Sequence, residues 1–415
     1  MKLLVVGGGG REHAIVYALS KSKKVTEIYA APGNAGIAKL AVCVNIKDTD
    51  IENIVNFAKD EQIDLVVVGP EASLALGIID ELQKAGIKAF GPSKGAAQIE
   101  SSKNFAKDLM SKYNIPTARY EVFEDYNDAI SYVEVAPFPT VIKYDGLAAG
   151  KGVVIANNFE EAKAALKDML LDDKFGHGKV VIEEYLEGPE FSFMCFVDGT
   201  NVYPLQLAQD HKRAYDNDMG PNTGGMGAYT PLPFITEDDY NQALNEIMIP
   251  TAKALVNEEI PFKGVLYGGL MKTKKGIKVI EFNCRFGDPE TEVVLPKLTS
   301  DIYDAFMAIV DGKEPVLTWD DKYYIGVVLA SKGYPGDYKK GFIIENADDD
   351  HIFHMGTKVD EKGNLVTNGG RVLFAVANGN TLEEANKKAN QLVDGIKCEN
   401  LFHRTDIGAK AYKKF

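Results

Sequence analysis

The first hundred residues alternate between short apolar runs and helical patterns, and this alternation constrains the fold more than any other feature. Residues 2–6, 26–31, 65–68 and 87–90 are apolar runs of strand length. Between them, apolar residues recur at helical spacing, as in residues 51–58. Alternating strands and helices predict a parallel sheet with helices on both faces. Ligands of such sheets bind beyond the carboxyl ends of the strands, where this chain carries glycine- and proline-containing turns.

The length, charge and cysteine content of the chain limit the classes of protein to which it can belong. A chain of 415 residues exceeds the size of one hydrophobic core, so we expect several domains. The net charge of -14, from 46 basic and 60 acidic residues, argues against nucleic acid as a partner. The 4 cysteines form no CxxC pair, which argues against a disulfide framework or structural zinc. No apolar run approaches the roughly 18 residues of a membrane span. We therefore expect a cytoplasmic protein with no membrane association.

The first glycine-rich turn, residues 7–11, does not match a dinucleotide site. The G-x-G-x-x-G pattern fails because Glu12 stands where the third glycine belongs. The second strand ends at Pro32 without a carboxylate that could hold a ribose hydroxyl. Glycine amides at a helix N-terminus beside Arg11 still favour an anion such as phosphate. A purely structural turn is the alternative.

A second glycine-rich segment, residues 139–153, has the pattern of strand, loop and strand. It is one residue too short for a Walker A loop, and Gly152 stands where that motif has its metal-binding serine or threonine. Flexible glycines let backbone amides approach a polyphosphate, and lysines add positive charge. The residues that would do so here are Gly146, Gly150, Gly152, Lys143 and Lys151. The alternative is a solvated hairpin tip.

The segment 281–292 places an acid, an amide and an arginine at a strand end. Side chains alternate along a strand, so Glu281 and Asn283 share one face while Phe282 enters the core. Two such oxygen donors suit Mg²⁺, which keeps its other positions for water and nucleotide phosphates. Arg285 would add a planar cationic fork for a carboxylate or phosphate. The alternative is a charged hairpin end with Glu281 and Arg285 paired at the surface.

The remaining segments complete the predicted architecture. An apolar strand at 180–186 leads into residues 187–190, which have the pattern of a hinge between two sheets, with a plain connecting strand as the favoured alternative. A hairpin at 264–283 carries the metal-binding candidates. Residues 209–231 are polar and glycine-rich, and we expect a functional loop with little regular structure. Within it, His211 is expected to be structural. The residues after 317 predict a small α+β cap.

Six segments, in the same order along nearly the whole chain, resemble the glycinamide ribonucleotide synthetases, or phosphoribosylamine–glycine ligases, of the ATP-grasp superfamily. They are residues 9–14, 31–36, 145–152, 210–213, 220–229 and 281–291. Departures from the family pattern are Tyr144 for alanine, Ser73 for proline and Glu292 for glutamine. None of them removes a charge on which the interpretation depends, although Glu292 could alter the local potential.

The resemblance implies a multidomain fold of α/β and α+β parts. The expected domains are an N-terminal parallel-sheet αβ domain at 1–100, a linker helix and ATP-grasp lid at 101–190, an ATP-grasp central domain at 191–317, and a small C-terminal α+β cap at 318–415. The family reaction joins glycine to 5-phosphoribosylamine in de novo purine biosynthesis. ATP becomes ADP and phosphate, glycyl phosphate is the intermediate, and the metal is Mg²⁺ or Mn²⁺. A monomer acting on these small molecules is expected.

The resemblance also implies roles for particular residues. Glu281 and Asn283 would bind the metal, and Arg285, Asp210 and Lys212 would be catalytic by holding glycine and the developing anion. The ATP-binding residues would be Lys103, Lys143, Gly146, Gly150, Lys151, Gly152, Glu183, Glu184, Tyr185, Leu186 and Glu190. The substrate-binding residues would be Gly9, Gly10, Arg11, Glu12, Arg213, Gly224 and Arg285, with Gly10 and Arg11 at the ribose 5-phosphate.

Three other functions stay open on the sequence alone. Another ATP-grasp carboxylate–amine ligase would depend on a different acid for ADP release. A nucleotide-dependent dehydrogenase would bind nicotinamide, against which the failed glycine pattern already argues. A regulator that only binds ATP would release no phosphate with any amine. No serine or cysteine triad is evident, so catalysis would depend on positioning, charge stabilisation and exclusion of water.

Overall fold

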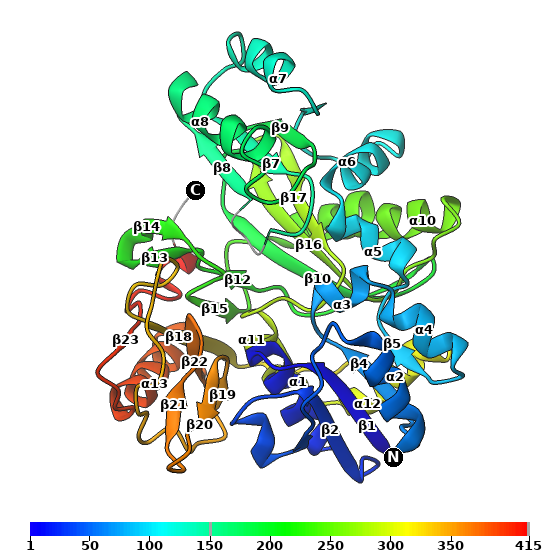
Figure 1. Cartoon of the computed structure of the whole chain (residues 1–415), viewed down its shortest axis with the longest axis vertical. Helices are drawn as coiled ribbons and strands as arrows, with labels where there is room; N and C mark the ends of the chain where they lie inside the picture. Colours follow the sequence, from blue (N-terminus) through cyan, green and yellow to red (C-terminus); the bar gives the residue numbers. More distant parts are fainter. Residues whose placement is uncertain (149–151, 413–415) are drawn as a thin grey trace.

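A computed structural model describes residues 1–148 and 152–412. The N-terminal part is a parallel five-stranded sheet in the order β3-β2-β1-β4-β5 (Figure 1). Its strands are β1 (Lys2–Gly7), β2 (Glu27–Pro32), β3 (Val42–Cys43), β4 (Leu65–Val68) and β5 (Ala89–Phe90). Its helices are α1 (Gly10–Ser20), α2 (Ile51–Asp60), α3 (Glu71–Ala75) and α4 (Ile78–Lys84), with a 3-10 turn η1 (Ile37–Lys39). The parallel-sheet prediction is confirmed, and β3 is a short addition that the sequence did not indicate.

The central strand of this sheet, β1, is apolar from Leu3 to Val6 because both of its faces are covered there. Leu4 and Val6 pack into one hydrophobic core together with α2 and α4. Leu3 and Val5 point the other way, into a second core that contains α1 and α12 (Ile302–Val310). Since side chains alternate along a strand, a run without polar residues requires a layer on each side.

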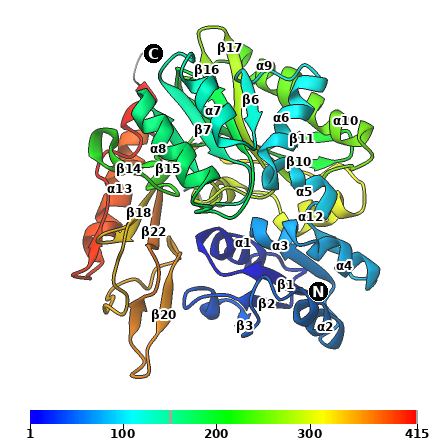
Figure 2. The same cartoon turned by 45° about the horizontal axis from the view of Figure 1, so that its top comes forward.

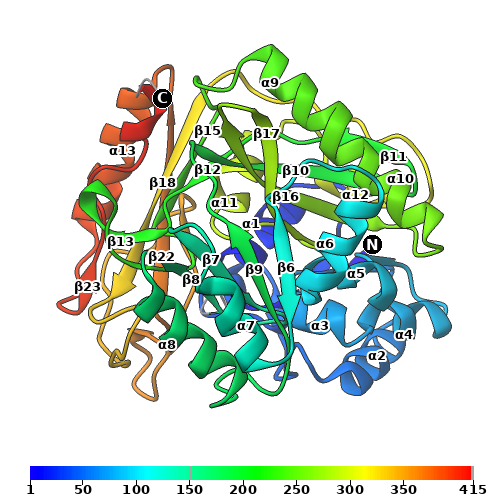
Figure 3. The same ribbon diagram turned by 90° about the horizontal axis from the view of Figure 1, so that it is seen from above.

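Two helices, α5 (Lys94–Ser101) and α6 (Lys103–Lys112), lead to a four-stranded antiparallel sheet in the order β6-β9-β7-β8. Its elements are β6 (Tyr120–Phe123), α7 (Tyr126–Val133), β7 (Thr140–Tyr144), β8 (Val153–Ala156), α8 (Phe159–Leu170) and β9 (Val180–Glu184). These elements, here called the lid, have their own hydrophobic core, which includes the fully buried Ile142 and Leu166. Seen from above, the lid lies between α13 (Leu382–Gly395) on one side and α2 and α4 on the other (Figure 3).

The central sheet has the antiparallel order β11-β10-β16-β17. Its strands are β10 (Glu190–Asp198), β11 (Asn201–Pro204), β16 (Lys263–Thr273) and β17 (Gly276–Asn283). A long helical stretch precedes the hairpin, formed by α9 (Glu237–Gln242), a π-helical segment η3 (Ala243–Met248) and α10 (Ile249–Asn257). Short helical turns follow the hairpin, α11 (Thr291–Val294) and η4 (Leu295–Lys297). The hairpin β16–β17 is confirmed.

The prediction of little regular structure in residues 209–231 is wrong. Strands β12 (Gln209–Asp210) and β15 (Gly227–Thr230) pair with each other, and β15 pairs with β18 (Tyr323–Ser331). Between them, β13 (Arg213–Tyr215) and β14 (Met219–Asn222) form a hairpin around a 3-10 turn, η2 (Asp216–Asp218). These strands could not be recognised from the sequence because their composition is polar. In addition β18, the strand with which β15 pairs, lies about a hundred residues later in the chain.

The C-terminal part is the predicted α+β cap, in which α13, β18, β20 and β22 can be found in Figure 2. Its sheet has the order β12-β15-β18-β22-β19, with β23 on β18. Its remaining elements are β19 (Ile352–His354), β20 (Thr357–Val359), β21 (Leu365–Thr367), β22 (Arg371–Gly379), β23 (Leu401–Phe402) and η5 (Ala409–Tyr412). Because β12 and β15 belong to this sheet, the cap is joined to the central part by backbone hydrogen bonds. Among the helices of the described ranges, none is both long and apolar enough to cross a membrane.

One buried arginine connects the C-terminal segment to the β13–β14 hairpin. The side chain of Arg404 is fully buried and donates two hydrogen bonds to the Asp406 carboxylate, at 2.7 and 2.8 Å. It also donates to Asp218 at 3.1 Å and to the carbonyl oxygen of Arg213 at 3.0 Å. Lys410 contacts the other oxygen of Asp218. Removing the guanidinium would delete a fully buried side chain and its hydrogen bonds to two half-buried carboxylates, which would keep only Lys410 and the Asn217 amide as partners.

Arg404→Ala should therefore lower the free energy of unfolding by about 2–3 kcal/mol, because it removes a fully buried side chain and its hydrogen bonds to charged groups. Lys388→Ala is the matched control, because it removes an exposed pair with Glu384 and should cost less than about 0.5 kcal/mol. Urea unfolding of the two variants checks this. Equal midpoints for both variants would contradict the role given to Arg404.

Candidate active site

A cavity of about 540 Å³ lies where the lid, the central sheet, the N-terminal part and the loop after β12 meet. Most of the predicted site residues line it: Arg11, Lys103, Lys143, Gly146, Gly152, Glu183, Glu184, Tyr185, Leu186, Glu190, Asp210, Lys212, Gly224, Glu281, Asn283 and Arg285. Gly9, Gly10, Glu12 and Arg213 lie outside its wall, and Gly150 and Lys151 fall outside the described residues.

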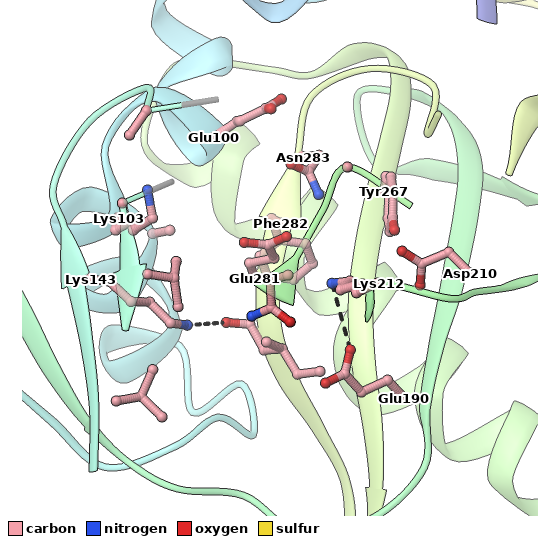
Figure 4. A pocket seen from close by; sticks show the side chains of 18 of the residues that line it. Glu100, Lys103, Lys143, Glu190, Asp210, Lys212, Tyr267, Glu281, Phe282 and Asn283 are labelled. Atoms are coloured by element: carbon pink, nitrogen blue, oxygen red, sulfur yellow. Dashed lines mark hydrogen bonds and ion pairs between the residues drawn. The ribbon is translucent and has the colours of Figure 1, made fainter. Parts of the chain in front are cut away.

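The metal-binding candidates share one face of β17, as predicted. Glu281 and Asn283 line the cavity, and Phe282 between them, 3% exposed, belongs to the hydrophobic core while also bordering the cavity (Figure 4). The register of β17 against β16 shifts beside Glu281, between Gly269 and Leu270. A bulge of this kind re-aims a side chain at a strand end.

Glu281 is an ionised carboxylate that no donor of the described chain hydrogen-bonds. Burial by itself raises its pKa, but the positive charges of Lys212, Lys143 and Lys103 hold the pKa below its ordinary value. Within the described ranges, no cluster of three or more His, Cys, Asp or Glu could form a closed metal cage. A free carboxylate beside an amide oxygen therefore fits a magnesium-type ion that takes few protein ligands.

Arg285 sits beside this pair, held by two acids that the sequence interpretation missed. Its guanidinium donates to Glu71 at 3.2 Å, to Glu100 at 2.9 Å and to the Asn283 side-chain oxygen at 3.3 Å. Burial alone would lower the pKa of Arg285, yet Glu100 and Glu71 raise it, so the group stays charged. Burial likewise would raise the pKa of Glu71, but Arg285 and Arg11 hold it at about 2. The only sequence signal for Glu71 was its place directly after the third long strand.

A lysine cluster forms the lid side of the cavity. The Glu183 carboxylate contacts Lys143 at 2.9 Å and Lys107 at 3.1 Å, and all three side chains are almost fully buried. Lys143 also donates to the carbonyl oxygen of Ile280, and Lys103 donates to that of Gly146. Burial lowers the pKa of Lys107 to about 8. Lys107 was missed, although its spacing of four from Lys103 on one helix puts both on the same face.

The opposite side of the cavity carries a lysine among acids. Lys212 lies 3.6 Å from the Glu190 carboxylate, and Figure 4 shows Asp210 and Tyr267 beside it. Burial lowers the pKa of Lys212, but Glu190, Asp210 and Glu281 together raise it above its ordinary value. Burial raises the pKa of Asp210 to about 7. Asp210 is the last residue of β12 and Lys212 follows it, so the strand that the sequence interpretation missed positions both side chains.

Arg213, His211 and Glu12 lie outside the wall of the cavity and have their polar partners within the protein. Arg213 is exposed and donates to the carbonyl oxygen of Gly220 within its own hairpin. His211 is fully buried and accepts a hydrogen bond from the Gly408 amide, which agrees with a structural role. Glu12 accepts hydrogen bonds from the Gly9 amide and from Arg11, so the turn is closed by its own acid.

Arg371 closes the cavity from the cap and was not predicted. It lines the wall together with Asp288, Tyr334 and Gly224. Its guanidinium contacts the Asp288 carboxylate at 3.0 Å and donates to the Gly224 carbonyl oxygen at 3.0 Å. The Gly224 amide in turn donates to the Tyr334 hydroxyl. No local pattern in the sequence could connect residues this far apart.

Comparison with known proteins agrees with this architecture. Family models match in chain order: phosphoribosylglycinamide synthetase N domain at residues 1–100, its ATP-grasp (A) domain at 101–291 and its C domain at 324–410. The phosphoribosylamine–glycine ligase of Halalkalibacterium halodurans is 54% identical over 99% of this chain and 97% of the relative. That of Escherichia coli O157:H7 is 46% identical over 100% of this chain and 99% of the relative.

Solved structures of known proteins also match the fold of this chain. The crystal structure of phosphoribosylamine–glycine ligase from Thermotoga maritima matches with a TM-score of 0.88 and 34% identity, over 98% of this chain and 100% of the other. The biotin carboxylase domain of Hydrogenobacter thermophilus 2-oxoglutarate carboxylase, in complex with MgADP, matches with a TM-score of 0.72 over 97% and 91%. At 18% identity this second likeness concerns the fold alone. The chain belongs to the phosphoribosylglycinamide synthetase family of ATP-grasp ligases.

Proposed function

We propose that this ligase joins glycine to 5-phosphoribosylamine in de novo purine biosynthesis, cleaving ATP to ADP and phosphate through a glycyl phosphate. The observation that carries the proposal is the convergence of Glu281, Asn283 and Arg285 with the lysines of the lid in one cavity. Relatives named for this reaction match the chain over its full length. One side of the cavity would therefore bind the metal ion and the ATP phosphates, and the other side would bind glycine and 5-phosphoribosylamine.

The nucleotide would bind between the lid and β17. Lys103 and Lys143 line this side, and they would contact the ATP phosphates as positive charges. Glu183 keeps Lys143 in place, whereas residues 184–186, at the end of β9 and the start of the hinge, would contact the adenine. Glu190, which begins β10, would accept the ribose hydroxyls. Closure of the lid would exclude water from the acyl phosphate.

Glu281 and Asn283 would hold Mg²⁺ or Mn²⁺. When bound, the ion supplies positive charge that offsets the charge of the transferring phosphoryl group. Arg285 lies next to this pair and would bind the glycine carboxylate, so that one carboxylate oxygen faces the γ-phosphate. Lys212, on the other side of Glu281, would stabilise the anion that develops on the glycine carbonyl. Catalysis then needs no covalent protein nucleophile.

The direct test is ADP and phosphate release with Mg-ATP and phosphoribosylamine generated in the cuvette, with and without glycine. We expect release to require both glycine and the amine. Folded protein that binds ATP but shows no dependence on glycine would contradict the choice of acid. Replacing glycine by other small acids then separates this ligase from other carboxylate–amine ligases.

Glu281→Gln should lower kcat by about 100-fold or more, because it removes the free carboxylate while preserving the shape of the side chain. Half-saturation with Mg²⁺ should also shift to higher concentration, which a titration of ADP release measures. Glu246→Gln, on the exposed side of η3, is the control and should match wild type. A Glu281→Gln enzyme with unchanged Mg²⁺ dependence would remove this residue from the metal site.

Arg285→Lys should lower kcat/KM for glycine by about 10- to 100-fold, or about 1.5–3 kcal/mol, since lysine keeps the charge but loses the planar fork. Arg285→Ala should lose more, because it also leaves the nearly buried carboxylate of Glu100 without its cation and leaves Glu71 only the more distant Arg11. Thermal unfolding of both variants separates loss of binding from loss of folding. Near-normal kcat/KM for glycine and phosphoribosylamine in Arg285→Ala would rule out this assignment.

A further inference from the structure

The carboxylates that line the cavity divide into two groups by their partners. Most are neutralised or hydrogen-bonded inside the protein. Glu71 and Glu100 bind Arg285, Glu183 binds two lysines, Glu184 binds Arg119 and Lys278, Glu190 pairs with Lys212, Asp288 pairs with Arg371, and Glu290 accepts from Ser192 and Tyr267. Among the carboxylates of the described residues that line the cavity, only those of Asp210 and Glu281 have neither a hydrogen bond nor an ion pair.

Glu281 already has a use as a metal ligand, which leaves Asp210. Its backbone is fixed by pairing with Ala228 at the end of β12, so the side chain is held at the wall. The groups that face it are Lys212 from its own segment, Glu190 from β10, Tyr267 from β16, Glu290 before α11 and Lys410 from η5. Burial and the two glutamates raise the pKa of Asp210 to about 7, against the effect of Lys212. A carboxylate of this kind is suited to taking up a proton near neutral pH.

The position of Asp210 also separates it from the phosphate side. Lys212 interacts with both Asp210 and Glu281, and Figure 4 shows it between them, with Lys143 beyond Glu281. If the glycyl carbonyl lies at Lys212 and its phosphate lies toward Glu281 and Lys143, the Asp210 side is open to the incoming amine. This placement depends on the function proposed above.

We propose that the Asp210 carboxylate is the proton acceptor for the amino group of phosphoribosylamine. The nitrogen lone pair attacks the carbonyl carbon of glycyl phosphate and forms the new C–N bond. The C–O bond to phosphate breaks, and phosphate leaves with that electron pair. The nitrogen gives one proton to an Asp210 oxygen, which later returns it to solvent. Asp210 is thus a catalytic residue of the second half-reaction and has no part in forming the acyl phosphate.

The test is Asp210→Asn, which keeps the size of the side chain and removes the proton acceptor. With phosphoribosylamine, kcat should fall by about 100-fold or more, while KM for glycine stays within about threefold. The wild-type rate should rise with pH through about 7, as Asp210 ionises, and the variant should lack this rise. Asp304→Asn, an exposed carboxylate on α12, should behave as wild type, and thermal unfolding verifies that both variants fold.

Hydroxylamine gives the second readout, because it attacks acyl phosphates as a neutral nucleophile and needs no base. ADP release and glycine hydroxamate formed with Mg-ATP, glycine and hydroxylamine should be retained within about threefold in Asp210→Asn. Equal loss of both reactions, or a raised KM for glycine, would overturn the proposal in favour of glycine binding. An unchanged kcat with phosphoribosylamine would also overturn it.

If wild type itself forms no hydroxamate, kcat, KM and the pH profile decide the role. Absence of glycine-dependent ADP release in wild type would instead refute the proposed function.

Discussion

The active site depends on keeping several cations charged while they are buried. Lys143, Lys107 and Arg11 are less than a tenth exposed, and Arg285 lies between two acids. A buried cation is costly unless a carboxylate or carbonyl compensates it. Each of these groups has such a partner, and the partners come from four separate parts of the chain. In a protein of net charge -14, this compensation lets positive charge gather where phosphates would bind.

The acids of the cavity differ in role according to whether they neutralise a buried cation. Acids such as Glu183 and Glu100 hold a cation in place, so their carboxylates already have a partner within the protein. Glu281 is ionised and free, because three lysines lie near it without contacting it directly. Asp210 is free but has a raised pKa, because burial and two neighbouring glutamates outweigh Lys212. Pairs of carboxylates whose environments move their pKa values apart commonly perform different chemical tasks.

The cap contributes to the site through backbone pairing and through two side chains. Strand β15 joins the loop after β12 to β18, and this junction sets the position of Lys212 and Asp210. Arg371 then connects the cap to Asp288 and Gly224 at the cavity wall. Arg404 fixes the hairpin that begins directly after Lys212. The distance in sequence between these partners explains why the site needs the whole chain.

The sequence by itself determined the features that depend on neighbours along the chain. The apolar run of β1 required a covered parallel sheet, and the two-residue period of β17 placed Glu281 and Asn283 on one face. Only the tertiary structure decided which acids hold Arg285, that Arg371 closes the cavity, and that residues 209–231 contain strands. Those outcomes depend on contacts between segments far apart in the chain, such as β15 with β18, and no local pattern records them. The same is true of the free Asp210 carboxylate, since its burial and its lack of a partner are properties of the packed cavity.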